Sequence, residues 1–505
     1  MFGTQANPML QLGAMGWFFY WVVIFSGIYL YIFFDTGVSE AYESVEYLTH
    51  DQWYAGGIMR SFHRYASDAL VIVIFLHLIR EYVMDRMHGP RYFSWVIGVI
   101  VLSMLYASGI TGYWIVWDKL AQYIAIATSE LLDTLPIFGE PIVRNFLHDS
   151  TLSGRFFTLF VFIHIAVPLI MLFFMWVHIQ RISRPRVNPP KNLAAGTLIM
   201  LLVLSVMFPA VSQGPADLSQ VPAVIKPDWF YMLIYPLLDI YPGKFIWGAL
   251  FILMLLLFIL PRVSKILVPA QIARVNLPEC NGCGRCVYDC PYSAVTLQPR
   301  TDDLPYTQQA VVNPHLCTGC GICVGACPTA TPLRRRTELV PGIELPDPTI
   351  GALRDRIMQG GERLHGNQRI IVFGCNYGHD VSLIDQENTA SLKIPCIGML
   401  PPSFIDFIIS KDIADGVLLT GCREGECFQR HGIEWTRQRI ARERDPYLRD
   451  RVPRERIKYC WSGSRGKKAL MKLLYAFRES LGSLNGKTIT GTDKSNSTGQ
   501  MTCKN

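Results

Sequence analysis

The stretch HRYASDALVIVIFLH (residues 63–77) decides how the first half of this chain folds, because it is mostly apolar and has a histidine at each end. A second stretch, HIAVPLIMLFFMWVH (residues 164–178), repeats that spacing. Fourteen residues are close to four turns of an α-helix, so both histidines of a stretch point the same way, about 21 Å apart along the axis. If the two helices face each other, His63, His77, His164 and His178 form two bis-histidine sites.

These stretches belong to a series of apolar runs, each about as long as the 20 residues that cross the hydrocarbon core of a membrane. The runs are residues 12–34, 66–87, 92–117, 156–180, 193–212 and 244–261. They predict an all-α transmembrane bundle of six helices. A lone intramembrane histidine is often a satisfied polar group at a helix contact. Two matched pairs at one spacing favour a functional role instead, since ionisable groups in a bilayer are costly.

The charges of the short loops predict the orientation, because Lys and Arg favour the cytoplasmic side. Basic residues follow the second, fourth and sixth runs, namely Arg80, Arg86, Arg91, Arg181, Arg184, Arg186, Lys191, Arg262, Lys265 and Arg274. The first and third loops are acid-rich, with Asp35, Glu40, Glu43, Glu46, Asp51, Glu130, Asp133, Glu140 and Asp149. We expect a multi-pass protein of the cytoplasmic (inner) membrane with both termini in the cytoplasm.

Cysteine usage separates the two halves of the chain. No cysteine precedes Cys280, and all 14 lie in residues 280–505. The cytoplasm keeps thiols reduced, so this clustering favours metal or redox chemistry over disulfides. The net charge of +7 arises mostly from loop and scattered basic residues. It does not form the basic patch of a nucleic-acid-binding protein, and we expect no nucleic-acid partner.

Several segments of the first half resemble cytochrome b of the bc and bf complexes. RSFHRYASDAL (residues 60–70) and HLIR (residues 77–80) resemble the second helix of that family. GYWIVWD (residues 112–118) is similar to the segment after its third helix, and LPIFGEPIV (residues 135–143) resembles the loop helix of the bf type. The resemblance covers about residues 12–262 and implies a membrane electron carrier.

The resemblance implies a four-helix core that holds two haem b groups. His63 is then paired with His164 near the outer face, and His77 with His178 near the cytoplasm. The extra, covalently attached haem of the bf family is not expected, because the first half lacks cysteine. The number of helices is also one or two short of the full cytochrome b of the bc complex.

Three further positions match haem-contacting residues of that family. Arg60 and Arg80 match arginines that meet haem propionates, a charge-assisted pairing that suits a guanidinium group. Without the resemblance they are ordinary interfacial arginines. Gly112 matches a glycine where haem and backbone approach closely, which requires the absence of a side chain.

The sequence Pro227-Asp228-Trp229-Phe230 resembles the PEWY signature of the quinol site in the same family. It departs from that signature by a shorter carboxylate and by the missing phenol at the last position. Asp228 is the candidate catalytic residue, as a general base that handles protons of the quinone substrate. The alternative is a solvated acid in a loop.

The pattern C-x2-C-x2-C-x3-C-P occurs twice, at residues 280–291 and 317–328. It is typical of bacterial ferredoxins with two 4Fe-4S clusters, in which the fourth cysteine of each run ligates the other cluster. The expected ligands are Cys280, Cys283, Cys286 and Cys327 for one cluster and Cys317, Cys320, Cys323 and Cys290 for the other. A pair of zinc sites is the alternative, since C-x2-C also binds zinc.

From residue 368 short apolar runs alternate with helical stretches, which predicts an α/β domain with a parallel sheet. Cysteines follow the predicted strand ends, where such domains place their sites. They are Cys375, Cys396, Cys422 and Cys427, and they suit one 2Fe-2S cluster. The segment Gly421–Cys427 resembles the delta subunit of methyl-viologen-reducing hydrogenase. A zinc site or a domain without a cluster remains the alternative.

The expected organisation is multidomain. Residues 1–265 form the transmembrane di-haem domain, 270–332 a small α+β ferredoxin domain of the bacterial type, 333–366 a linker, 367–481 the delta-subunit-like domain and 482–505 a disordered tail. No glycine-rich phosphate loop follows a strand, so nicotinamide or flavin must bind another subunit.

Three functions follow from this organisation. The chain relays electrons between a soluble dehydrogenase or a flavoprotein of the heterodisulfide reductase type and membrane quinone. Alternatively, it is an anchor that relays electrons to another cytochrome, or a quinol-oxidising subunit as in the bc complex. The expected partners are membrane lipid, quinone, the soluble redox subunits and, as in cytochrome bc complexes, a second copy in a homodimer.

Overall fold

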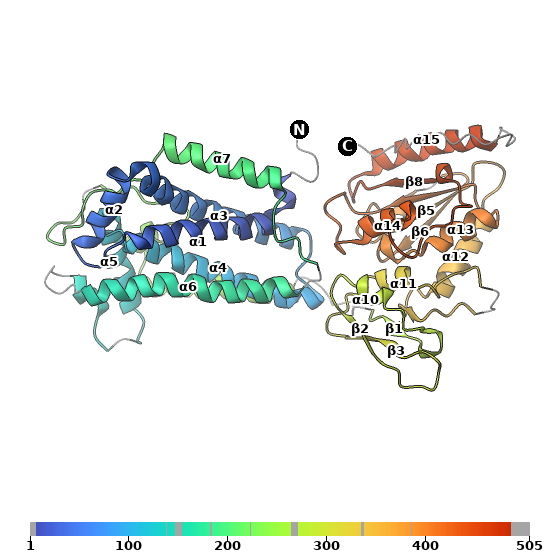
Figure 1. Cartoon of the computed structure of the whole chain (residues 1–505), viewed down its shortest axis with the longest axis horizontal. Coiled ribbons are helices and arrows are strands. Elements are labelled where there is room, and N and C mark those ends of the chain that lie inside the picture. Colours follow the sequence, from blue (N-terminus) through green and yellow to red (C-terminus); the bar gives the residue numbers. More distant parts are fainter. Residues whose placement is uncertain are drawn as a thin grey trace. The chain divides into compact units, whose positions relative to one another are not determined.

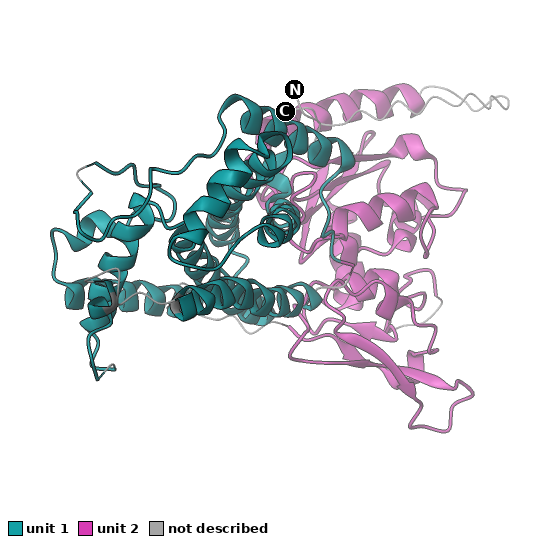
Figure 2. Cartoon of the chain, turned by 60° about the vertical axis from the view of Figure 1, so that its left-hand side comes forward, with its two compact units in different colours: residues 1–181, 185–266 teal, residues 182–184, 267–505 magenta. Residues whose placement is uncertain are grey.

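The computed structural model describes residues 7–137, 139–146, 154–181, 184–222, 224–263, 271–334, 338–384 and 386–485. Two compact units are present, residues 1–181 with 185–266 and residues 182–184 with 267–505 (Figure 2). Each unit has a buried core of its own. Most of the predicted disordered tail, residues 486–505, lies outside the described residues.

The first unit is helical. Its helices are α1 (Leu12–Ile32), α2 (Glu40–His50), α3 (Ile58–Val83), α4 (Tyr92–Trp114), α5 (Lys119–Asp133), α6 (Gly154–Gln180), α7 (Lys191–Met207), α8 (Tyr235–Leu238) and α9 (Gly243–Val263). Helix α1 packs along α3, and α4 packs along α6 (Figure 1). The two histidine-bearing stretches therefore lie on α3 and α6, and each has a dedicated neighbouring helix.

Four helices are long and apolar enough to cross a membrane, namely Leu12–Ile32, Gly89–Trp114, Phe157–Gln180 and Gly243–Val263. Large apolar side chains on them remain exposed, among them Phe25, Phe162 and Phe251 at 66%, 66% and 69%. Such exposure suits contact with lipid, where apolar surface carries no cost. The chain is therefore a membrane protein of the helical type.

The other two predicted spans differ from these four. Helix α7 has 17 residues, and α3 carries the charged residues Asp68, Arg80 and Glu81 along its length. Helix α3 also begins at Ile58, eight residues before the predicted start. Its first turns hold charged and polar residues that interrupt the apolar pattern, so hydropathy alone finds only its later part.

The second unit begins with two small antiparallel sheets. Its elements are β1 (Arg274–Val275), α10 (Arg285–Tyr288), β2 (Val295–Pro299), β3 (Gln308–Val312), α11 (Ile322–Ala326) and β4 (Ile343–Glu344). Strand β1 pairs with β4, and β2 pairs with β3. Gly284 and Gly321 precede α10 and α11 at φ +74° and +72°. A glycine is needed there because L side chains rarely adopt this conformation.

A four-stranded parallel sheet follows, as predicted for the C-terminal part. The elements are α12 (Ile350–Glu362), β5 (Ile370–Cys375), β6 (Thr389–Ile394), α13 (Pro402–Ser410), β7 (Gly416–Thr420), α14 (Gly432–Ala441), β8 (Ile457–Cys460) and α15 (Lys467–Asn485). The strand order is β6-β5-β7-β8. Every residue of β5 and β7 is buried. Central parallel strands covered on both faces require such runs.

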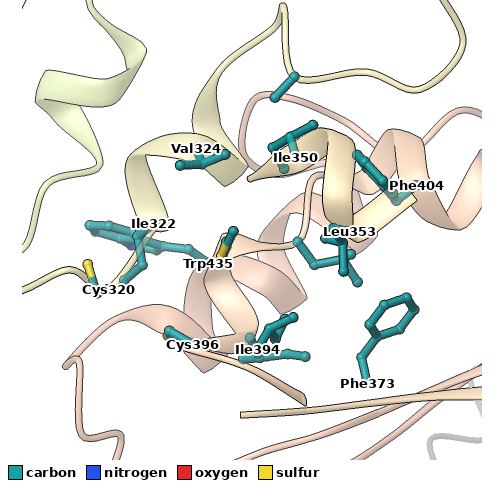
Figure 3. Close-up of a cluster of buried hydrophobic side chains, with 14 of the residues drawn as sticks. Cys320, Ile322, Val324, Ile350, Leu353, Phe373, Ile394, Cys396, Phe404 and Trp435 are labelled. Carbon is teal, nitrogen blue, oxygen red and sulfur yellow. The ribbon is translucent and has the colours of Figure 1, made fainter. Parts of the chain in front are cut away.

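Two cores cover the faces of this sheet. On one face, Ile370, Val372 and Leu418 pack with the buried side of α15. On the other, Phe373 joins a larger core that also contains Ile350, Phe404 and Trp435 (Figure 3). This larger core continues without a break into the cysteine-rich sheets.

Part of the predicted linker at residues 333–366 is folded. Residues Ile343–Glu344 form strand β4, and Ile350–Glu362 form helix α12. The Thr349 hydroxyl accepts a hydrogen bond from the backbone N–H of Ala352 at 3.1 Å and caps the helix. Ile350, Leu353 and Ile357 are buried on one side of it. Composition identified the prolines of this segment but not its apolar periodicity.

We expect Phe477→Ala to weaken the C-terminal sheet. Phe477 on α15 is 1% exposed, and its ring lies against Gly416 at the start of β7. Removing such a ring leaves a cavity and costs about 3–5 kcal/mol. Tyr475→Ala, at a 49% exposed position of the same helix, is the control and should cost less than about 0.5 kcal/mol. Amide hydrogen exchange of β5 and β7 measures both effects.

Candidate metal centres

His63 on α3 and His164 on α6 face each other within the first unit. Their ring centroids lie 6.3 Å apart, with 65° between the planes. The Nδ1 atoms of both rings lie 3.0 Å from a backbone carbonyl oxygen, that of Val23 for His63 and that of Ser108 for His164. A carbonyl accepts only from a protonated nitrogen, so each Nε2 keeps its lone pair. Metal-ligating histidines are held in this way.

Hydroxyl groups on the neighbouring helices repeat the same arrangement. Ser26 Oγ on α1 and Thr111 Oγ1 on α4 each lie 3.2 Å from the Nδ1 atom of the histidine they face. Each hydroxyl also donates to a carbonyl of its own helix, that of Val22 at 2.7 Å or that of Ser108 at 2.9 Å. The pair α1 and α3 is thus built like the pair α4 and α6.

A glycine of the neighbouring helix faces each histidine ring. A Cβ atom on Gly27 would lie 2.9 Å from Cε1 of His63, and one on Gly112 would lie 2.8 Å from Cε1 of His164. At the second pair the corresponding distances are 3.5 Å from Gly13 to His77 and 3.6 Å from Gly98 to His178. The glycines therefore repeat the 14-residue spacing of the histidines.

The predicted propionate-binding arginines have protein partners in this structure. Arg60 donates to Ser212 Oγ at 2.7 Å, lies 3.5 Å from Glu46 and also hydrogen-bonds to Thr49. Arg80 lies 3.3 Å from Glu81 Oε1. Glu81 Oε1 is in turn 3.9 Å from Nδ1 of His77. Both arginines thus lie one turn or less from a histidine, and their role toward a haem stays a prediction.

Asp228 is buried, which rules out the alternative of a solvated loop acid. Its side chain is 3% exposed and lies 2.5 Å from Nη2 of Arg64. The Tyr113 hydroxyl donates to the same carboxylate, and the backbone N–H of Phe230 donates to Oδ1 at 2.7 Å. Trp229 beside it is 69% exposed. The motif that begins at Pro227 therefore joins the loop to α3 next to His63 and to α4 next to Gly112.

The eight cysteines of the two repeated motifs line two cavities. One cavity is lined by Cys280, Cys283, Cys286 and Cys327, together with Gly282, Gly284 and Pro328. The other is lined by Cys290, Cys317, Cys320 and Cys323, together with Tyr292, Thr318 and Gly321. The fourth cysteine of each run lies in the cavity of the other run. The sets that the sequence predicted are thus the sets that the fold brings together.

The electrostatics of these cavities suit a positively charged occupant. Burial raises the pKa of Cys286 and of Cys320 to about 12, and the neighbouring thiols add to the effect. Four thiolates are unfavourable at such a site unless a cation offsets their charge. Metal coordination deprotonates a thiol outright. The donor set therefore fits an iron-sulfur cluster in each cavity, held by thiolates that the protein alone does not stabilise.

The four cysteines of the C-terminal domain also converge. Cys375, at the end of β5, lies with its Sγ atom 3.8 Å from that of Cys422, which follows β7. Cys396 and Cys427 hydrogen-bond through their thiols, which raises the pKa of Cys396 and lowers that of Cys427. Cys422 hydrogen-bonds to Cys427 as well. One continuous group of four thiols lies at the carboxyl ends of the strands.

The zinc alternative has a defined geometry, in which about 2.3 Å separates each thiolate sulfur from one shared ion. Within the residues that the structure describes, no three His, Cys, Asp or Glu side chains are arranged to hold a single metal ion. The cysteine cavities contain the two crossed sets of four that the sequence predicts for two clusters.

Three family models match the chain in succession. Residues 3–185 match cytochrome b/b6/petB, residues 279–331 the 4Fe-4S dicluster domain, and residues 370–485 the delta subunit of methyl-viologen-reducing hydrogenase. The three predicted resemblances are confirmed. Cytochrome b-like and iron-sulfur domains thus follow one another in a single chain.

Curated cytochromes b are similar to the first half. Cytochrome b of Acanthamoeba castellanii is 25% identical over 289 residues, which are 50% of this chain and 73% of that protein. Cytochrome b of Rhodospirillum rubrum is 25% identical over 273 residues, 48% of this chain and 66% of that protein. A chain of a hyperthermophilic respiratory Complex III is 20% identical, with a TM-score of 0.42, and covers 51% of this chain and 76% of its own length.

Several residues of these sites were not found from the sequence. Gly13, Gly27 and Gly98 share the spacing of the histidines, and that spacing was a usable signal. Arg64, which binds Asp228, is adjacent to His63, and its position in the sequence does not indicate this role. No sequence pattern indicated that a loop some 160 residues away would reach it.

We expect Gly27→Val to disrupt the pair of His63 and His164 while leaving His77 and His178 in place. The new side chain would begin 2.9 Å from the His63 ring, so the ring must leave its carbonyl partner. Purified protein should then contain about one haem b in place of two, as counted by an optical redox titration. Gly248→Val on α9, where no atom lies within 4 Å of the built Cβ, should retain both. Full haem content in both variants would contradict this assignment.

Proposed function

We propose that this chain is a membrane-bound electron-transfer subunit that connects a soluble redox partner to the quinone pool. The partner is a dehydrogenase or a flavoprotein of the heterodisulfide reductase type. The cofactors are two haem b groups, two 4Fe-4S clusters and one 2Fe-2S cluster. Quinone is the substrate, and the enzyme is the multi-subunit oxidoreductase to which the chain contributes.

The observation that carries this proposal is the presence of both kinds of centre in one chain. The first unit brings His63 and His164 together in a helical bundle with apolar exposed faces, and it carries His77 and His178 fourteen residues further along the same two helices. The second holds two cavities lined by crossed sets of four cysteines and a further group of four thiols. A membrane electron-transfer subunit accounts for all of them, whereas a zinc-binding or nucleic-acid-binding chain leaves the histidine pairs unexplained.

The chain's own residues would hold these groups and adjust their electrostatics. Haem and iron-sulfur groups, when bound, exchange electrons one at a time at potentials set by their protein surroundings. His63 and His164 present Nε2 lone pairs because carbonyls hold the opposite nitrogens. Buried thiols become ligands once a cation offsets their charge.

The proposed quinone site is built around Asp228. Reduction of a quinone consumes two protons for every two electrons, so a proton-handling group must contact the substrate. Asp228 is a candidate beside the outer histidine pair, because Arg64 joins it to the helix that carries His63. The exposed ring of Trp229 offers a flat apolar surface beside it. In this proposal Arg64 holds the carboxylate in place, and Asp228 exchanges protons with the substrate.

The same contacts also favour the second candidate function, a relay to another cytochrome without a quinone site. Arg64, Tyr113 and the Phe230 amide occupy the carboxylate of Asp228. Because these groups hydrogen-bond to the carboxylate, Asp228 must lose one of these bonds before it can accept a proton. The third candidate, quinol oxidation as in the bc complex, needs a high-potential iron-sulfur partner from another chain.

The proposed placement follows from the loop charges. The chain would span the cytoplasmic (inner) membrane, with both termini and the iron-sulfur domains in the cytoplasm. The soluble partners then approach the C-terminal thiol group, and a homodimer as in cytochrome bc complexes is the proposed assembly. A quinone site near Asp228 would lie at the outer face, so electrons that reach it cross the membrane.

The experiment that tests the core of the proposal is purification of the native complex, followed by an optical and electron paramagnetic resonance redox titration. We expect two b-type haems with bis-histidine ligation and three iron-sulfur signals. A preparation that lacks b-type haem would refute the proposal. A preparation with haem but no clusters would reduce it to the cytochrome alone.

Asp228→Asn should separate the first two candidate functions. Loss of an acid that transfers a proton lowers turnover by about 10²-fold or more. We therefore expect quinone-linked turnover to fall by about that factor while the haem spectra stay unchanged. Asp239→Asn is the matched control, because Asp239 is a carboxylate of the same region whose partner is the Tyr123 hydroxyl at 3.1 Å.

Turnover that is unchanged in Asp228→Asn, together with haem reduction insensitive to a quinone-competitive inhibitor, would favour the relay function. If haem is lost from Asp228→Asn but not from Asp239→Asn, the ion pair with Arg64 is structural and the quinone site must be sought elsewhere.

A further inference from the structure

The two cysteine-lined cavities differ in what surrounds them. Residues of the ferredoxin part and of strand β4 enclose the first set, Cys280, Cys283, Cys286 and Cys327, and Arg300 donates to the Cys280 carbonyl. The second set, Cys290, Cys317, Cys320 and Cys323, is approached by residues of the C-terminal domain. The cavity of the second set is therefore the one that hydrogen bonds join to the C-terminal domain.

Gln429 makes one link between the second set and the C-terminal thiols. It lies two residues after Cys427 and is 4% exposed. The Tyr292 hydroxyl donates to its Oε1 atom at 2.7 Å, and the Thr318 hydroxyl lies 3.4 Å from the same atom. Tyr292 and Thr318 both line the second cavity. One buried amide thus joins the Cys427 loop to two walls of that cavity.

Three glycines make a second link, which we call the glycine seam, Gly325–Gly398–Gly432. A Cβ atom on Gly325 would lie 2.1 Å from the Gly398 carbonyl oxygen, and one on Gly398 would lie 3.0 Å from Cα of Gly432. A Cβ atom on Gly432 would lie 2.3 Å from Sγ of Cys396. Backbone therefore packs directly on backbone from α11, which carries Cys323, to the thiol of Cys396.

Arg439 holds the seam together. It is 1% exposed, and its Nη1 donates to the Gly398 carbonyl at 2.9 Å. Its Nη2 donates at 2.6 Å to Asp289, the residue before Cys290. Arg444 binds the other oxygen of Asp289 at 2.5 Å. Two guanidinium groups and one carboxylate leave a net positive charge between the second set and Cys396.

We infer that electrons pass between the C-terminal thiol group and the second cysteine set directly across the glycine seam, with Arg439 as the positioning residue. The inference rests on the proposed function, because it requires clusters at these cysteines.

The step transfers one electron. A reduced cluster held by Cys375, Cys396, Cys422 and Cys427 is oxidised, and an oxidised cluster held by the second set is reduced, with no bond formed or broken. The soluble flavoprotein or dehydrogenase of the proposed function supplies the electron. Close backbone packing excludes water and side chains from the gap, and the charge near Arg439 stabilises the added negative charge on either side.

The route is tested in the full-length complex reduced with dithionite and frozen. Electron paramagnetic resonance measures how fast the C-terminal cluster relaxes, which depends on its nearest paramagnetic neighbour. Cys317→Ser, which removes a ligand of the second set, should abolish the enhanced relaxation. Cys283→Ser, which removes a ligand of the first set, should preserve it. The reverse pattern, or enhanced relaxation in both variants, would overturn the route.

Arg439→Gln tests the positioning role. Removing the charge should disfavour reduction of the C-terminal cluster about tenfold, a shift of about 59 mV to lower potential for one electron. Arg439→Lys should restore most of the potential. Arg437→Gln on the same helix, whose partner is the exposed Glu424 at 2.7 Å, is the control and should leave the potential unchanged.

Iron content is determined first in every variant. Absence of clusters from the wild-type complex refutes the proposed function itself, whereas clusters with an unchanged potential in Arg439→Gln refute only the positioning role. Gly325→Ala covers the case in which Arg439→Gln fails to fold. It should slow haem reduction from the C-terminal side, and Gly351→Ala, where the built Cβ meets only ordinary contacts from 3.5 Å, should not. Equal rates in both glycine variants contradict a route through the seam.

Discussion

The rings of His63 and His164 are each held by a hydrogen bond to a backbone carbonyl of the neighbouring helix. The hydrogen bond from Nδ1 of His63 to Val23, and its counterpart from His164 to Ser108, decides which nitrogen remains available. For that bond to form, the neighbouring helix must come close, and a glycine beside each ring permits the approach. At the other end of the bundle the 14-residue repeat places Gly13 beside His77 and Gly98 beside His178, where built Cβ atoms would lie 3.5 and 3.6 Å from the rings. The positions of the glycines therefore determine how closely the helices pair, and the pairing orients the histidine rings.

In the second unit the candidate metal-binding groups are buried cysteine thiols. Burial raises the pKa of thiols in its two cavities, so these thiols are neutral without a cation. They ionise and become ligands when a cation binds. Glycines again set the distances, here at the start of α10 and α11 and along the seam that leads to Cys396. Among the described residues of this unit, the buried side chains of Asp289, Asp406, Asp415 and Arg439 each take part in an ion pair. Asp289 accepts hydrogen bonds from Arg439 and Arg444. A buried carboxylate without such partners would destabilise the fold.

The helix pairing and the cysteine sets could be predicted from the sequence, because the spacing of the histidines and of the cysteines indicates which side chains lie together. The histidine repeat predicts facing helices, and the crossed cysteine sets follow from the doubled C-x2-C-x2-C-x3-C pattern. Contacts between distant segments could not be predicted. Arg64 reaches Asp228 across 164 positions, and the carboxylate that resembled a free base is an ion-pair partner. The prolines around α12 concealed its apolar periodicity, and the polar residues in the first turns of α3 concealed where that helix begins.

The exchange of fourth cysteines between the two cavities has a consequence for biogenesis. Cys290 completes a site whose other ligands come later in the chain, and Cys327 completes one whose other ligands come earlier. Neither site exists until translation has passed both motifs and the two halves have docked. Loss of Cys290 or Cys327 therefore removes a wall residue from the cavity of the other motif, so damage within one motif alters both cavities.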